Sequence, residues 1–169
     1  LSNHSVHLSI YYAGKLLVIG QVDSPSSFNY SVTAGSSFDL LETSSGRVIL
    51  TFQTEEERKR RLNRRKLFMN LENKKNHSSL NILEKKFSSK IIHEITKNKC
   101  EVVKSLQVAG VTNISAPIFD HTNQAIAAVT IPFLQRINRD SINDLNLVKT
   151  TKLLKNHSLK LSKSLGYKI

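Results

Sequence analysis

The chain has 169 residues, which is long enough for one domain with its own core, and its content of 39% hydrophobic and 22% charged residues is typical of globular proteins. No apolar run approaches the roughly 20 residues needed to span a bilayer, and the first residues lack the regions of a signal peptide. The single cysteine, Cys100, excludes a disulfide framework or a cysteine zinc cluster. We expect a cytoplasmic domain without a membrane contact. Because the chain does not begin with Met, we also expect a fragment of a longer protein.

The net charge of +12 is unevenly distributed along the chain. Residues 54–99 carry a net charge of +8 and residues 136–169 carry +6, while residues 1–53 and 100–135 each carry −1. The basic segments have helical patterns, and the nearly neutral segments have strand patterns. A solvated outer layer of helices explains this distribution about as well as a nucleic-acid-binding face does. The densest run, residues 58–66, is interpreted as a solvated helix face, and a nucleic-acid patch is the alternative.

The first third of the chain predicts a hairpin, a third strand and two helices. Residues 6–12 and 16–22 are rich in β-branched and aromatic residues and are separated by Ala13-Gly14-Lys15, as in a β-hairpin. Residues 28–32 alternate between apolar and polar, which predicts a half-buried strand. Thr43-Ser44-Ser45-Gly46 precedes an apolar run that ends at Phe52, which predicts a buried helix with hydroxyl residues at its start. A capping box of Thr54 and Glu57 predicts the start of the next helix.

The remainder predicts a helix, three strands and a long final helix. Residues 80–97 have one apolar face at helical spacing, formed by Leu80, Leu83, Phe87, Ile91 and Ile95. Residues 100–106, 111–119 and 125–131 are predicted strands, and residues 120–123 form a turn between the last two. Residues 138–165 are a predicted amphipathic helix that ends before Gly166, with Ile142, Leu145, Val148, Leu161 and Leu165 among its apolar positions. Strands joined by short turns predict an α+β fold, an antiparallel sheet flanked by helices.

No catalytic motif is present in the sequence. Phosphate-binding glycine loops, dinucleotide fingerprints, His-Glu-x-x-His and Gly-x-Ser-x-Gly are all missing. The six histidines are scattered, and His4 and His7 are expected on opposite sides of a strand, which disfavours a metal site. We therefore expect no enzyme, no catalytic residues, no metal and no cofactor.

The last hairpin predicts one wall of a binding site. If Phe119 pairs with Gln124 across the turn, Asn113 faces Thr130, Ser115 faces Ala128 and Pro117 faces Ile126. Because strand side chains alternate, one face then carries Val111, Asn113, Ser115, Ala128 and Thr130. Small and polar side chains fill a core poorly. This face is either partly solvated or packed by a helix, or it lines a cavity for a small ligand.

The helix start at Thr43-Ser44-Ser45-Gly46 predicts a second wall. Free amides at a helix N-terminus, with hydroxyl groups and a glycine, suit a carboxylate or a phosphate. Ordinary N-capping is the alternative. Together the two walls predict a pocket for a small polar or anionic molecule.

Three stretches resemble the effector-binding domain of IclR-type transcriptional regulators. They are residues 45–58, residues 110–120 continued by 124–130, and residues 162–167, in the family's order along nearly the whole chain. The resemblance implies a GAF-like antiparallel sheet, a small-molecule effector, assembly into a homodimer or homotetramer, and DNA contact through an N-terminal winged helix-turn-helix that lies outside this chain. It also implies that the ligand-binding residues are Ser44, Ser45, Gly46, Val111, Asn113, Thr130 and Pro132, with Phe28 and Tyr30 as apolar lining.

The chain also departs from the family pattern. Ser105-Leu106-Gln107-Val108 stands where members often have acidic residues, Asn113 where a cysteine is common, and Pro132 where a small polar residue is usual. These departures argue against the metal-containing form of the pocket. Two other functions stay open: a GAF-like sensor with another output, such as a kinase, and a basic nucleic-acid-binding protein that acts through residues 58–66.

Overall fold

The computed structural model describes residues 3–26, 30–71, 77–135 and 146–168. The order of elements is β1 (Val6–Tyr12), β2 (Lys15–Val22), β3 (Ser37–Asp39), α1 (Ser44–Thr51), α2 (Glu55–Leu71), α3 (His77–Lys86), α4 (Ser89–Asn98), β4 (Glu101–Lys104), β5 (Val111–Phe119), β6 (Ala125–Leu134) and α5 (Leu147–Ser164). The strands form one sheet in the order β3-β2-β1-β6-β5-β4, and every neighbouring pair is antiparallel. This confirms the predicted α+β fold.

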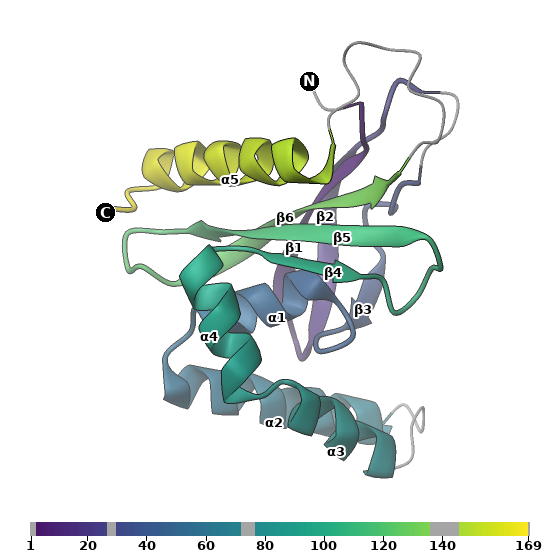
Figure 1. The fold of residues 1–169 in the computed structure, drawn as a ribbon. Helices are drawn as coiled ribbons and strands as arrows, with labels where there is room; N and C mark the ends of the chain where they lie inside the picture. Colours follow the sequence, from purple (N-terminus) through teal and green to yellow (C-terminus); the bar gives the residue numbers. More distant parts are fainter. Residues whose placement is uncertain (1–2, 27–29, 72–76, 136–145, 169) are drawn as a thin grey trace.

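The sheet separates two layers of helices (Figure 1). The helix α5 lies on one face, while α1 lies against the other, with α2, α3 and α4 beyond it. Each face has its own apolar core. On the α5 face, Leu154 packs with Ile114 and Ile131, and on the α1 face, Val48 and Ile49 pack with Leu16 and with helix α4 through Ile95.

The predicted first hairpin is confirmed. Tyr12 pairs with Lys15, so the turn consists of Ala13 and Gly14, which both have positive φ values of 49° and 95°. Two positive φ angles define the tight turn whose twist matches that of the strands. A Cβ on Gly14 would also lie 2.9 Å from the carbonyl oxygen of Arg64, so this turn packs directly on α2.

The strand predicted at residues 28–32 is wrong where the structure describes it. Residues 30–33 belong to no strand, and the third strand is β3, a three-residue segment that starts at Ser37. Phe28 lies outside the described residues. The segment that follows β2 first contacts that strand at a turn formed by Ala34 and Gly35. The Ala34 amide donates to the Gln21 side chain, and the Gly35 amide donates to the Val18 carbonyl. The strand that pairs with β2 therefore lies later in the chain than predicted, at Ser37–Asp39.

The helix predicted over residues 80–97 is two helices, α3 and α4, separated at Phe87 and Ser88. Ser88 has the extended backbone of an N-cap residue (φ −83°, ψ 168°) and starts α4 in a new direction. The predicted core face is largely confirmed, because Leu83, Phe87, Ile91 and Ile95 all contact the α1-side core. The side chain of Leu80 lies outside the described residues.

The apolar face predicted for the final helix is wrong at the three positions that the structure describes. Val148, Leu161 and Leu165 are 76%, 44% and 42% exposed, and Ile142 and Leu145 lie outside the described residues. The buried face of α5 instead consists of Thr150, Leu154, Ser158 and Ser162. A periodicity based on hydropathy misses a face made of small hydroxyl residues.

These hydroxyl groups dock α5 on β5. Ser158 Oγ donates to the Pro117 carbonyl, and Ser162 Oγ accepts from the Phe119 amide at 2.9 Å, next to an irregularity in the pairing of β5 with β6. The predicted stop at Gly166 is confirmed. Its φ is 88°, its amide donates to the Lys163 carbonyl, and the Tyr167 amide donates to the Ser162 carbonyl.

Candidate functional site

The site is built around the short helix α1, whose eight residues are all buried. Thr43 is the N-cap, and its hydroxyl accepts a hydrogen bond from the Gly46 amide at 3.3 Å. Among the described residues, no acceptor is bonded to the backbone amides of Ser44 and Ser45. First-turn amides of a helix have no partner within the helix, so these two donors remain for another group.

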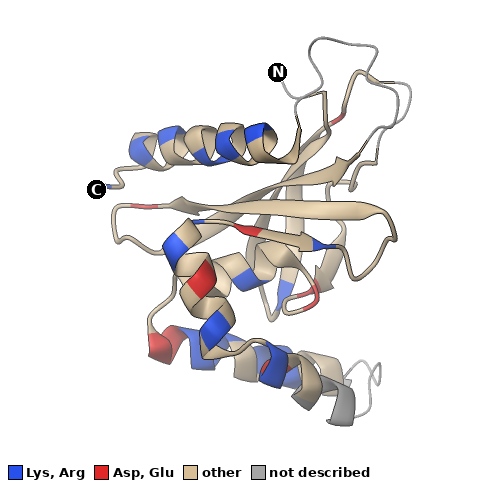
Figure 2. Cartoon of the chain, in the orientation of Figure 1, with Lys and Arg blue, Asp and Glu red and all other residues tan. Residues whose placement is uncertain are grey.

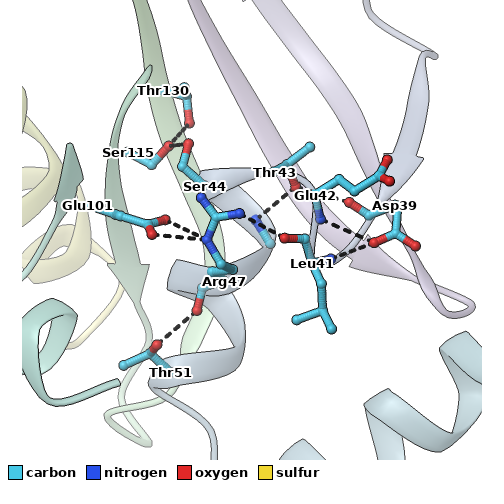
Figure 3. A network of polar contacts seen from close by, with 11 residues as sticks. Asp39, Leu41, Glu42, Thr43, Ser44, Arg47, Thr51, Glu101, Ser115 and Thr130 are labelled. Atoms are coloured by element: carbon cyan, nitrogen blue, oxygen red, sulfur yellow. Dashed lines mark hydrogen bonds and ion pairs between the residues drawn. The ribbon is translucent and has the colours of Figure 1, made fainter. Parts of the chain in front are cut away.

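Four hydroxyl groups join α1 to the sheet, and we call them the hydroxyl chain. Ser44 Oγ lies 2.6 Å from Ser115 Oγ, Ser115 Oγ lies 2.7 Å from Thr130 Oγ1, and Thr130 Oγ1 lies 2.9 Å from Ser45 Oγ. Figure 3 shows the first two of these bonds, from Ser44 on α1 to β5 and β6.

The hydroxyl chain has one proton more than its three bonds use, since each hydroxyl carries one proton. If the bonds run in one direction, the spare proton is on Ser45, and if they run in the other, it is on Ser44. Either end can therefore offer a donor or an acceptor. This arrangement can adapt to a polar group placed beside α1.

The register predicted for the β5–β6 hairpin is wrong by two residues. Ser115 faces Thr130 and Asn113 faces Pro132, whereas we expected Asn113 to face Thr130. The cause is at the turn, where Phe119 pairs with Ala125 and not with Gln124, and where the pairing shifts between Ile118 and Phe119. A shift of two preserves the alternation, so the predicted set of residues still shares one face.

The structure brings some of the predicted site residues together and not others. Ser44, Ser45 and Thr130 are in the hydroxyl chain. Val111 and Pro132 are buried further along the same face, and Asn113 is half-buried between Pro132 and Val103 in the sheet. Tyr30 is half-buried and outside any strand.

Gly46 has a structural role that the sequence did not reveal. A Cβ at this position would lie 1.9 Å from the carbonyl oxygen of Leu40. The backbone at Leu40, just before α1, thus occupies the position that a side chain at residue 46 would need. This close contact fixes how α1 leaves the preceding loop.

Two polar residues that we did not expect at the site lie on β1. His7 pairs with Thr130 and Ser9 with Ala128, so both side chains share the α1 face of the sheet. The Nδ1 atom of His7 and the Oγ atom of Ser9 are buried and have no hydrogen-bond partner among the residues that the structure describes. Burial lowers the pKa of His7 from 6.5 to about 4, so its imidazole is neutral at pH 7. The sequence shows that His7 and Ser9 alternate with the apolar residues Val6, Leu8 and Ile10. It does not show that β1 pairs with β6.

His4 lies elsewhere, as expected. Its ring contacts Phe133, in the core on the α5 face, with 4.7 Å between the centroids. Within the described residues, no group of three or more His, Cys, Asp or Glu side chains is placed to hold a metal ion. Cys100 is buried, which raises the pKa of its thiol.

A buried ion pair holds α1 in place (Figure 3). Arg47 Nε donates to both carboxylate oxygens of Glu101 on β4, at 2.9 and 3.1 Å, and its Nη1 donates to the Leu41 carbonyl at 2.7 Å. Burial raises the pKa of Glu101, and the charge of Arg47 opposes this shift. The Asp39 carboxylate accepts from the amides of Leu41 and Glu42, which fixes the loop before α1.

The basic run at residues 58–66 is largely engaged within the domain. Arg58 donates to three carbonyl oxygens at the end of α1, at Leu50, Thr51 and Gln53. Arg65 is fully buried and bonds Asp39 at 2.9 Å. Ion pairs with carboxylates on the helices are formed by Lys59, Arg60, Arg61 and Lys66. Figure 2 shows basic residues on the helices and few on the sheet.

The capping box at the start of α2 forms only in part. The Glu57 amide donates to Thr54 Oγ1 at 3.2 Å, as expected. The Glu57 carboxylate accepts instead from Arg60 and Arg61, whose hydrogen bonds lower its pKa to about 2. None of the described helices is long and apolar enough to cross a membrane.

The comparisons with known proteins agree with this architecture. The family model "Bacterial transcriptional regulator IclR C-terminal" matches residues 1–163. The crystal structure of IclR from Thermotoga maritima superposes with a TM-score of 0.69 at 22% identity and covers 98% of this chain and 63% of that chain. The C-terminal domain of the Escherichia coli regulator KdgR superposes with a TM-score of 0.67 at 19% identity, over 98% of this chain and 89% of that one.

A third structure holds a ligand. It is an IclR homolog from Microbacterium hydrocarbonoxydans in complex with 4-hydroxybenzoate, with a TM-score of 0.67 at 14% identity, over 96% of this chain and 60% of that chain. The chain thus spans less than two thirds of the Thermotoga and Microbacterium proteins that it matches. No curated protein sequence matches it.

The fold and the matched family model place this chain in the class of regulatory domains of bacterial transcription factors. The chain belongs to the IclR family and corresponds to the C-terminal effector-binding domain of that family.

Proposed function

We propose that this domain senses a small anionic metabolite, and that binding of the metabolite modulates DNA binding by a linked helix-turn-helix domain. The observation that carries the proposal is the start of α1. The backbone amides of Ser44 and Ser45, which have no acceptor in the described part of the chain, lie at the positive end of a buried helix and beside the hydroxyl chain.

A carboxylate suits this place for three reasons. Helix N-termini attract negative charge because their amides and their macrodipole point outwards. The amides of Ser44 and Ser45 are donors, and the hydroxyl chain can present a third donor at either of its ends. The related structure with bound 4-hydroxybenzoate supports a small carboxylic acid as the class of ligand.

The neutral His7 and the hydroxyl of Ser9 add polar groups on the same face of the sheet. They favour a ligand with a second polar group besides its carboxylate. Val111 and Pro132 supply apolar surface further along β5 and β6, and Tyr30 and Phe28 stay proposed apolar lining residues.

For a ligand to act as a signal, it must bind two arrangements of the protein with different affinities. Helix α1 is suited to report occupancy, because Arg47 connects it to the edge strand β4 through Glu101. In this proposal the assembly is a cytoplasmic homodimer or homotetramer, and DNA is contacted only by the linked domain.

A thermal-shift screen tests the site. Small mono- and dicarboxylates, hydroxy acids and aromatic acids are screened against the corresponding neutral amides. We expect at least one acid to raise the melting temperature and its amide to have little effect. The Ser45→Trp variant removes one end of the hydroxyl chain and places a bulky ring at the start of α1, so it should abolish the shift; circular dichroism checks that the variant is folded. If no acid stabilises the domain, and Ser45→Trp leaves regulation by the intact protein unchanged, the proposal fails.

A further inference from the structure

A cavity lies beneath α5, away from the start of α1. Its volume is 260 Å³, and its lining includes Lys99, Pro117, Phe119, Lys155, Leu159 and Tyr167. Drug-sized ligands occupy pockets of roughly 300–1,000 Å³, so this cavity is sized for a smaller molecule with about one ring. None of its lining residues belongs to the hydroxyl chain.

Lys99 reaches this cavity from a strained backbone. It follows α4 with a left-handed conformation (φ 54°, ψ 29°), a position that glycine or asparagine usually fills. A side chain in this conformation is unfavourable because its Cβ lies too close to the following carbonyl oxygen. The ammonium group of Lys99 lies 4.8 Å from the ring centroid of Phe52 and 5.7 Å from that of Phe119. Aromatic faces therefore hold this charge in place.

Lys155 on α5 brings a second ammonium group to the cavity. It also lines a neighbouring cavity of 480 Å³ that contains Cys100, and its charge acts to lower the pKa of that thiol. Within the part of the chain that the structure describes, neither Lys99 nor Lys155 forms an ion pair with a carboxylate. Lys59 and Lys66 on α2, in contrast, both do so.

The other walls of the cavity are mostly apolar. The rings of Phe119 and Tyr167 are stacked with 4.7 Å between centroids and an angle of 20° between their planes. Leu159 and Pro117 complete this surface. The hydroxyls of Ser158 and Ser162 already bond backbone groups, which leaves the two ammonium groups as the ionic contacts.

We infer that this cavity is a second ligand site, which binds a small organic anion with a flat apolar body. The anionic group lies between the ammonium groups of Lys99 and Lys155, and the apolar body contacts Phe119, Leu159 and Tyr167. Two lysines that line one cavity, have no carboxylate partner among the described residues and lie beside an apolar wall are complementary to such a molecule in charge and in surface. The site does not depend on the one proposed at α1.

An NMR titration of the ¹⁵N-labelled chain with benzoate tests this inference. We expect saturable shifts at the amides of Lys99, Phe119, Leu159 and Tyr167. The double variant Lys99→Gln/Lys155→Gln should weaken this binding about tenfold or more, which corresponds to about 1.4 kcal/mol. The control Lys152→Gln/Lys160→Gln removes the same charge from exposed positions outside the cavity and should change the affinity by less than about twofold.

Two further probes test the two halves of the proposed ligand. Benzamide keeps the ring without the charge, and inorganic phosphate keeps an anionic charge without the ring, so both should bind much more weakly than benzoate at these residues. Equal binding of either probe, or equal loss in both double variants, would overturn the inference. Benzoate shifts confined to Ser44 and Ser45 would support the α1 site and overturn this one.

Discussion

Ser45 on α1 and Thr130 on β6 are 85 residues apart in the sequence, and their hydroxyl groups are hydrogen-bonded at 2.9 Å. With Ser44 and Ser115 they place four hydroxyls between a helix and a sheet, where apolar packing is usual. Burial of such groups is costly unless each finds a partner. The hydroxyl chain therefore fixes the position of α1 and keeps polar groups beside the helix N-terminus.

The centre of the hydroxyl chain should matter more for stability than an isolated hydroxyl. Ser115→Ala removes a group that bonds both Ser44 and Thr130, and leaves both without that partner. We expect a loss of about 1–3 kcal/mol in the free energy of unfolding, measured by urea denaturation. Ser9→Ala is the matched control, since Ser9 is equally buried but its Oγ has no partner within the described ranges. This change should be neutral or stabilising, and equal losses in the two variants would argue against the hydroxyl chain.

Gly46 should be intolerant of even one methyl group. In Gly46→Ala the new Cβ would lie 1.9 Å from the Leu40 carbonyl oxygen, so the backbone at the entrance of α1 must move. We expect a loss of more than about 3 kcal/mol, or failure to fold, in a thermal unfolding experiment. Gly20→Ala is the control, because no atom lies within 4 Å of a Cβ at that position. A stable Gly46→Ala domain would show that the contact with Leu40 does not fix α1.

The buried ion pair predicts unequal effects for its two partners. Arg47→Met leaves the Glu101 carboxylate and the Leu41 carbonyl without their donor, and should cost about 3 kcal/mol. Glu101→Gln should cost less, because burial already disfavours the charged carboxylate and raises its pKa. Arg60→Gln, in an exposed pair with Glu57, should cost less than about 1 kcal/mol.

Acid pH should reduce the penalty of Arg47→Met. A carboxyl group with a raised pKa binds its proton more tightly when folded, so stability increases as the pH falls towards that pKa. Arg47 lowers the pKa of Glu101, so the Arg47→Met variant has a more strongly raised Glu101 pKa. The variant therefore gains more stability than the wild type as the pH falls. A penalty that is constant between neutral and mildly acidic pH would contradict the assignment.

Local patterns were sufficient for much of this fold. The turn at Ala13 and Gly14, the start of α1 after Thr43 and the stop at Gly166 depend on backbone conformations that nearby residues reveal. The shared face of Val111, Asn113, Ser115, Ala128 and Thr130 followed from alternation alone, which a register error of two residues leaves intact.

The features that sequence reasoning missed depend on contacts between distant segments. His7 and Ser9 join the site because β1 pairs with β6, a neighbour more than 115 residues away that no local pattern indicates. The buried face of α5 was missed because Ser158 and Ser162 bond the backbone of β5, and a hydropathy pattern treats serine as exposed. Basic residues such as Arg65 were assigned to solvent, although Asp39 holds this one in the interior.

His7 should make the stability of the domain depend on pH in a defined window. Its pKa is about 4 in the folded state and 6.5 ordinarily, so between these values the unfolded chain binds more protons than the folded one. The stability contributed by neutral His7 is therefore complete above pH 6.5 and is lost as the pH falls towards 4. From pH 7.5 to pH 5, wild-type protein should lose about 2 kcal/mol relative to His7→Gln in urea denaturation. His157→Gln, at an exposed position on α5, should follow the wild type over the same range. If His7→Gln also follows the wild type, His7 does not stay neutral in the folded domain.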